Sequence, residues 1–68
     1  MRSVSGRDLA RAVERKEWVL LRVHGSHHIY GKPGSNVRLS IPVHDNRDLK
    51  TGLVEHVMRL AVISEDEV

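Results

Sequence analysis

Hydrophobic residues near the N-terminus recur at the spacing of a helix. Leu9, Ala12 and Val13 fall on one side of such a helix, while charged side chains occupy the rest of its surface. Ser5 precedes these positions and is suited to cap the free backbone N–H groups of a first turn. The pattern predicts a helix over residues 6–16.

The middle of the chain has the composition and alternation of β-strands. Residues 18–23 form an apolar run rich in strand-favouring side chains, and residues 27–32 follow after a Gly-Ser turn. A third strand is predicted over residues 37–43, where apolar and polar residues alternate. Four apolar side chains share one face of that strand: Val37, Leu39, Ile41 and Val43. Such alternation predicts a sheet with one buried and one solvated face.

A second amphipathic helix is predicted over residues 50–61, where apolar residues return at helical spacing. Residues 64–67 have the pattern of a capping box, which predicts a short terminal turn or a frayed end. The order is therefore α-β-β-β-α, an α+β fold class with a three-stranded antiparallel sheet and both helices on one face. Double-stranded RNA-binding domains share this arrangement, but a shared architecture alone assigns no function.

The length of 68 residues predicts a single domain, residues 1–68, with room for a shallow surface site and none for a separate cofactor lobe. The absence of cysteine excludes disulfides and thiolate metal sites. No apolar run approaches the ~18 residues of a membrane span, and the N-terminus lacks the apolar core of a secretory signal. We expect a protein without membrane association that stays in the cytoplasm.

Charge is unevenly distributed along the chain. The chain has eleven Lys and Arg and nine Asp and Glu. Three of the acidic residues form the run Glu65-Asp66-Glu67 near the C-terminus. Residues 1–63 therefore carry eleven basic and six acidic side chains, a net charge of +5. This excess favours a polyanionic partner such as RNA, although a merely solvated basic surface explains the charge equally well.

Five histidines are the main candidates for chemistry: His24, His27, His28, His44 and His56. Neighbours on a strand point to opposite faces, so His27 and His28 cannot readily share a metal ion. The chain also lacks cysteine ligands and a His-x₃-His pair on a helix. We expect no metal and no cofactor.

Histidine is well suited to RNA cleavage. RNA carries its own nucleophile, the 2′-hydroxyl, so an enzyme has to remove that proton, stabilise the charged phosphorane and protonate the leaving 5′-oxygen. An imidazole with an unperturbed pKa of about 6.5 accepts or donates a proton near neutral pH. Lys32 and Arg38 flank the predicted hairpin and are candidates to hold the phosphate. Any single surface histidine is nevertheless more often inert than catalytic.

One segment resembles a known family. Gly25-Ser26-His27 is similar to the Gly-Ser-His signature of HicA toxins, the messenger-RNA-cleaving halves of bacterial toxin–antitoxin pairs. Further segments resemble the family in the same order, so that the resemblance covers nearly the whole chain: residues 5–9, 18–22, 41–44, 48–53 and 61–64. The chain departs from the family at Glu17 and Val62, where glycine is usual. These departures bear on local turn geometry rather than on the chemistry.

The resemblance implies a metal-independent endoribonuclease of the bacterial cytoplasm that cleaves mRNA and is neutralised by a HicB-type antitoxin covering its active face. It also assigns the catalytic role to His27. Strand alternation complicates this assignment, because it groups His27 with Ile29 and His28 with Tyr30. If Ile29 faces the helices, His28 is the exposed residue, unless a bulge at the start of the strand turns His27 outward. His27 is therefore the first candidate and His28 the alternative.

The residues expected to contact RNA lie around this strand: Gly25, Ser26, His28, Tyr30, Lys32 and Arg38. For Tyr30 and Trp18, packing in the core or at its rim is favoured over base stacking, and His44 is a weaker candidate at the border of the site. Two other functions stay open: a non-catalytic RNA-binding module and a degenerate toxin that only binds protein. A double-stranded RNA-binding domain should carry a basic cluster at the start of its second helix, where this chain has only Lys50, with Asp48 close by.

Overall fold

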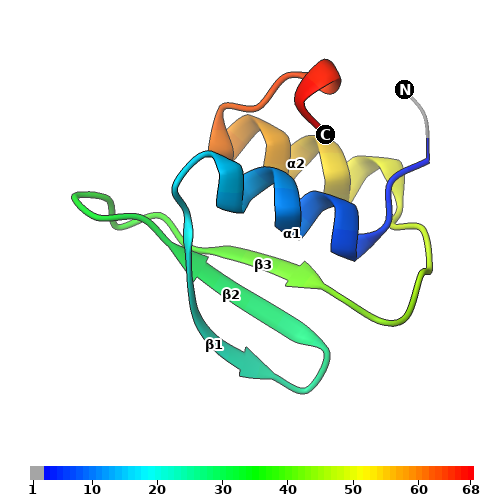
Figure 1. Cartoon of the computed structure of the whole chain (residues 1–68), viewed down its shortest axis with the longest axis horizontal. Coiled ribbons are helices and arrows are strands. Elements are labelled where there is room, and N and C mark those ends of the chain that lie inside the picture. Colours follow the sequence, from blue (N-terminus) through cyan, green and yellow to red (C-terminus); the bar gives the residue numbers. More distant parts are fainter. Residues whose placement is uncertain (1–2) are drawn as a thin grey trace.

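The computed structural model of the chain describes residues 3–68. Its elements follow the predicted order α-β-β-β-α, with a 3₁₀ turn, η1, added at the C-terminal end (Figure 1). Their bounds are α1 Gly6–Arg15, β1 Val19–His24, β2 His27–Gly31, β3 Leu39–Pro42, α2 Thr51–Ala61 and η1 Glu65–Glu67. The predicted fold class is confirmed, and the third strand is shorter at both ends than the alternation predicted.

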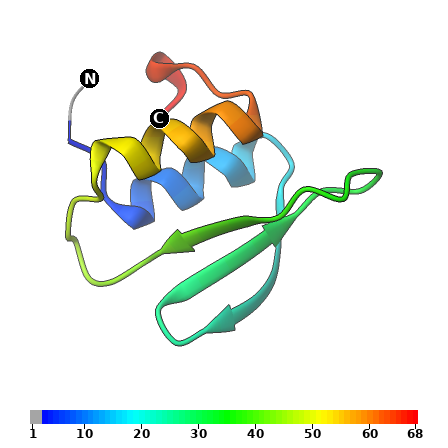
Figure 2. The same cartoon turned by 180° about the vertical axis from the view of Figure 1, so that it is seen from behind.

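The three strands form one antiparallel sheet in the order β1-β2-β3. Both helices lie on the same side of this sheet, which Figures 1 and 2 show from opposite directions. We call the other side of the sheet the open face. β1 contains a bulge between Leu20 and Arg22, so that Leu21 is an extra residue in the pairing with β2.

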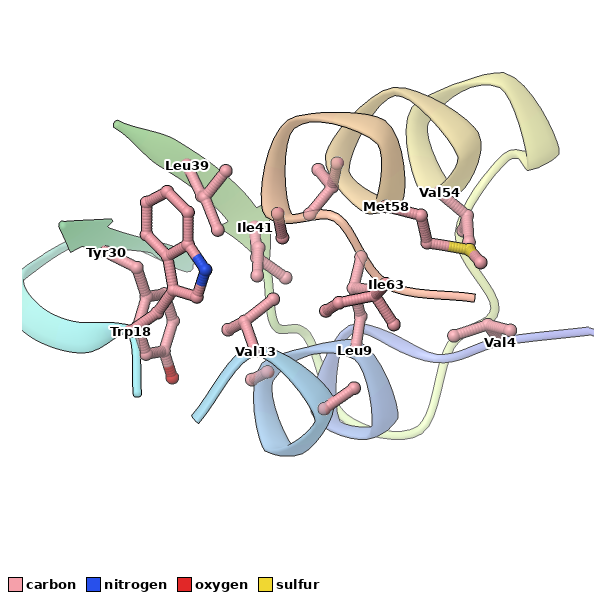
Figure 3. Close-up of a cluster of buried hydrophobic side chains, with 14 residues drawn as sticks. Val4, Leu9, Val13, Trp18, Tyr30, Leu39, Ile41, Val54, Met58 and Ile63 are labelled. Atoms are coloured by element: carbon pink, nitrogen blue, oxygen red, sulfur yellow. The ribbon is translucent and has the colours of Figure 1, made fainter. Parts of the chain in front are cut away.

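The hydrophobic core lies between the helices and the strands β2 and β3 (Figure 3). Leu9 and Val13 of α1, Val54 of α2, and Leu39 and Ile41 of β3 are each at most 1% exposed. Both helices pack chiefly against β3. All six residues of the edge strand β1 are therefore exposed, although their apolar composition is that of a buried strand.

The start of α1 is fixed by a cap and by a close backbone contact. The Ser5 hydroxyl accepts a hydrogen bond of 3.1 Å from the Asp8 backbone N–H, as the sequence predicts. A Cβ atom on Gly6 would lie 1.8 Å from the carbonyl oxygen of Pro42. Only glycine therefore lets α1 begin directly against the end of β3.

Two residues that follow the helices adopt the left-handed backbone conformation. Glu17, after α1, has φ 71°, and Val62, after α2, has φ 58°. These are the two positions where the family resemblance leads one to expect glycine. Glycine has this conformation available without strain, whereas a β-branched residue such as Val62 is strained there.

Neither α1 nor α2 has the length and apolar character that a helix needs to cross a membrane, and these are the two α-helices within residues 3–68.

Candidate functional site

The sheet register decides which face each residue of β2 occupies. His28 pairs with Ile41 and Tyr30 pairs with Leu39, and both partners are buried beneath the helices. His28 and Tyr30 therefore lie on the helix side. His27, which is exposed, and Ile29 alternate with them and lie on the open face.

This arrangement decides between two alternatives that the sequence left open. Had Ile29 faced the helices, His27 would have pointed inward and a bulge in β2 would have been required to expose it. The bulge instead lies in β1, and β2 pairs with β3 in regular register from His27 to Tyr30. Exposure of His27 on the open face follows from ordinary strand alternation. His28 is half-buried on the opposite side.

A second histidine lies directly opposite His27. His24, the last residue of β1, pairs with His27 across the two-residue turn Gly25-Ser26, in which Gly25 has φ 65°. Cross-strand partners share a face with their Cβ atoms about 5 Å apart. We call these two exposed imidazoles the histidine pair. From the sequence His24 is one of five candidate histidines, and its position next to a two-residue turn is the signal that marks it as the partner of His27.

The turn beside the histidine pair is tied to the chain that leaves β3. The Val43 backbone N–H donates a hydrogen bond of 2.7 Å to the Ser26 carbonyl oxygen. His44 is the next residue, and this contact brings it to the same end of the sheet as His27. Its Nε2 lies 3.9 Å from Oδ2 of Asp45, and its side chain is exposed.

Tyr30 belongs to the core and not to the site. Its side chain is 1% exposed, and its hydroxyl donates a hydrogen bond of 2.6 Å to Oε2 of Glu14 in α1. Burial, followed by the Glu14 carboxylate, raises the pKa of the Tyr30 phenol above its usual value. A ring so enclosed cannot stack on a base, so the expectation that Tyr30 contacts RNA is wrong. The preference for core packing is confirmed for Tyr30 and for Trp18, which is 5% exposed (Figure 3).

The cations expected from the sequence lie at the far end of β2 from His27. Lys32 follows His27 by five residues, a separation of about 17 Å along an extended strand. Its ammonium lies 5.7 Å from the centre of the Trp18 ring, a distance that permits a cation–π interaction. The cation of the strands that shares the open face with His27 at this end is instead Arg22, which pairs with Ile29 two positions away.

The strands and their connections are free of acidic residues. No Asp or Glu occurs between Glu17 and Asp45, a segment that contains three Lys and Arg and four of the five histidines. The rest of the chain has eight Lys and Arg against nine Asp and Glu. The positive charge therefore resides in the sheet, and an anion at the histidine pair meets no carboxylate from the strands.

The acidic C-terminal run folds back onto α1. Arg15 donates a hydrogen bond of 2.9 Å to the Glu67 carbonyl oxygen, and Lys16 forms an ion pair with the Glu67 carboxylate. Ser64 caps η1 with the hydrogen bonds of a capping box, so the predicted terminal turn is confirmed. Glu67 of this run thus contacts two cations at the C-terminal end of α1, on the helix side of the sheet.

Within residues 3–68, no three side chains of the metal-binding types His, Asp and Glu come together as a potential metal site.

The model of a family described as the HicA toxin of bacterial toxin–antitoxin systems matches residues 6–63, the range from the start of α1 to just beyond the end of α2. A search of curated proteins found no relative of this chain.

Proposed function

The chain belongs to the HicA toxin family of bacterial toxin–antitoxin systems, and on this premise we propose that it is an endoribonuclease that cleaves mRNA without a metal ion. The observation that carries the proposal is the histidine pair. Two imidazoles lie in direct cross-strand register on an exposed face whose strands contain no carboxylate. Such a site accepts an anionic substrate and offers two proton-transfer groups to it.

RNA cleavage by the 2′-hydroxyl needs two proton transfers. The 2′-oxygen attacks the adjacent phosphorus while a general base takes its proton, and the bond to the 5′-oxygen breaks as a general acid protonates that oxygen. The products are a 2′,3′-cyclic phosphate and a 5′-hydroxyl. His27 is the residue that the family signature marks for catalysis, and His24 is near enough to serve as the complementary acid or base.

The cleavage site also needs a cation for the charge of the phosphorane. Arg22 pairs with Ile29, two strand positions from His27, so its guanidinium is within reach of a phosphate held at the histidine pair. Fixed donors aimed at developing charge commonly contribute more to catalysis than any other single effect. We assign this role to Arg22, with Gly25 and Ser26 of the turn bordering the same phosphate.

A cognate antitoxin of the HicB type is the second part of the proposal. The family implies an antitoxin partner, and covering the open face would keep RNA from the histidine pair. All six residues of β1 are exposed, among them the apolar Val19 and Leu21 on the open face. A protein partner would bury this apolar surface together with the site. We propose the bacterial cytoplasm as the location of the pair.

Analysis of the cleavage products of a bacterial mRNA transcript tests the proposed reaction. Purified protein should cut the transcript and leave 2′,3′-cyclic phosphate and 5′-hydroxyl ends. A transcript with a single 2′-deoxynucleotide on the 5′ side of the main cleavage site should resist cutting at that bond only. If the protein binds the transcript without cutting it, the chain is an RNA-binding module instead. Unchanged cutting at the deoxynucleotide would refute the mechanism.

A further inference from the structure

A hollow lies in the open face beside the histidine pair. Its volume is about 480 Å³, within the range of roughly 300–1,000 Å³ that is typical of ligand sites. Residues of all three strands and of the segment before β3 line it: Leu21, Arg22, Ile29, Arg38, Leu39 and Ser40. We call it the Ile29 hollow.

The Ile29 hollow combines an apolar floor with polar and cationic walls. Ile29 pairs with Arg22 on one side and with Ser40 on the other, so a row of three residues crosses the open face. The bulge in β1 adds Leu21 to the same side. These features suit a nucleobase, because its flat faces are apolar and its edges carry hydrogen-bonding oxygens and nitrogens.

Arg38 is held in position at the rim of this hollow. Its Nη1 donates hydrogen bonds of 3.3 Å to the Ser35 carbonyl oxygen and 3.1 Å to the Val37 carbonyl oxygen. The absence of a side chain at Gly31 leaves room for it, since a Cβ there would lie 3.2 Å from the same nitrogen. A guanidinium that is already ordered loses less entropy when a ligand binds.

On the open face, the cross-strand set Arg22, Ile29 and Ser40 is the immediate neighbour of the histidine pair. Ile29 follows His27 by two residues on the same face, a separation of about 7 Å. A phosphodiester at the histidine pair therefore brings a neighbouring base to the hollow. We propose that the Ile29 hollow is a base-binding subsite that holds one unpaired nucleobase of the RNA next to the cleaved bond. This inference rests on the proposed function.

The base has to be unpaired for a geometric reason. In a duplex the bases face each other, and proteins recognise the helix mainly through its shape, phosphates and 2′-hydroxyls. A single strand can turn a base outward onto a protein surface. Both aromatic residues of the chain, Trp18 and Tyr30, are buried, so the stacking surface is supplied by Ile29 and the guanidinium of Arg38.

A second, smaller hollow continues the first along β2. It has a volume of about 260 Å³ and shares Leu21 and Arg38 with the Ile29 hollow, and it extends to Lys32. The two hollows and the histidine pair thus follow one another along the open face. This succession matches an extended single strand that continues beyond the cleaved bond.

Binding of RNA by a chain that does not cut it tests the subsite. The probe is a fluorescein-labelled single-stranded 12-nucleotide RNA of mixed sequence, titrated at fixed salt with the His27→Ala protein. Adding Arg38→Gln or Ile29→Ala should weaken binding about tenfold each, the size expected for one lost base contact. Arg59→Gln, a charge-matched control on the exposed side of α2, should change the affinity less than about twofold. Circular dichroism establishes that each variant is folded.

Two further measurements distinguish the subsite from the proposed function. If the parent protein cuts RNA but the Arg38 and Ile29 variants bind it like the control, the subsite is refuted and the nuclease proposal stands. If the parent does not cut RNA but these variants lose RNA binding, the subsite stands and the nuclease proposal falls. A duplex of the same sequence should bind at least tenfold more weakly, and equal binding would refute the requirement for an unpaired base. Variants that lose antitoxin but retain RNA would show that the hollow serves the protein partner instead.

Discussion

Tyr30 of β2 donates a hydrogen bond of 2.6 Å from its hydroxyl to Oε2 of Glu14 in α1. This bond joins the sheet to the first helix at the edge of the core, on the side of the sheet that faces away from the open face. The contact accounts for the burial of a polar tip among apolar side chains, because a buried hydroxyl requires a partner.

Removal of this hydroxyl should affect stability and not activity. Tyr30→Phe is expected to lower the free energy of unfolding by about 1 kcal/mol, the net contribution of one hydrogen bond. RNA cleavage should stay at the parental rate. Urea denaturation and a cleavage assay on the same preparation measure both. A variant with parental stability and lost cleavage would mean that the hydroxyl acts on RNA after all.

The left-handed conformation of Val62 predicts a substitution that increases stability. Val62 is 82% exposed, so its side chain adds little packing, while its φ of 58° is strained for a β-branched residue. Val62→Gly should therefore raise the free energy of unfolding by about 1 kcal/mol. The control is Glu55→Gly inside α2, which should lower it by about 1 kcal/mol. Equal losses from both substitutions would contradict the left-handed conformation at Val62.

The contact between η1 and α1 should respond to acid. The Lys16 ammonium and, after it, the Ser64 backbone N–H and hydroxyl lower the pKa of Glu67 from 4.5 to about 2. A lowered pKa means that the state in which η1 contacts α1 favours the ionised carboxylate. The stabilisation of this contact by Glu67 is therefore complete above pH 4.5 and is lost as the pH falls through about 2. An NMR titration of the Glu67 side chain and the Ser64 amide measures this. Lys16→Gln should move the midpoint up toward 4.5, and a parental midpoint already at 4.5 would refute the contact.

The element order and the core positions could be predicted from the sequence, because periodicity records which side of each helix and strand is apolar. The exposure of β1 could not. Its run of valine and leucine resembles a buried strand, but burial depends on where the helices lie, and both pack chiefly against β3. The sequence contains no local signal for that choice.

The sequence identified His27 as a candidate but could not decide which face of the sheet it occupies. Ile29 and Tyr30 are consecutive residues, and either side chain could pack in a core, so composition could not decide which of them faces the helices. The face of His27 depends on that choice, because His27 and Ile29 share a face. The pairing of Tyr30 with the buried Leu39 decides it. Arg22 reaches the open face through a register that includes a one-residue bulge, which no pattern in the β1 sequence indicated.

Cleavage should not depend on a divalent ion. Excess EDTA is expected to leave the rate of RNA cleavage unchanged, because the histidine pair and the 2′-hydroxyl of the RNA supply both proton transfers and the nucleophile. The assay compares rates with and without EDTA, and a metal-dependent nuclease in the same buffer is the control. Loss of activity with EDTA and its return on addition of a divalent ion would contradict acid–base cleavage by histidine alone.

His27 and His28 are neighbours in sequence on opposite faces of the sheet, which makes them a matched pair for the central claim. RNA cleavage by His27→Ala and by His28→Ala, with unfolding measured for each, is the most direct test. His27→Ala should cut at least ~10²-fold more slowly, as for a lost acid–base group, with stability changed by no more than about 0.5 kcal/mol. His28→Ala should retain cleavage. A folded His27→Ala that cuts RNA at the parental rate, beside a folded and inactive His28→Ala, would contradict the assignment of catalysis to the open face.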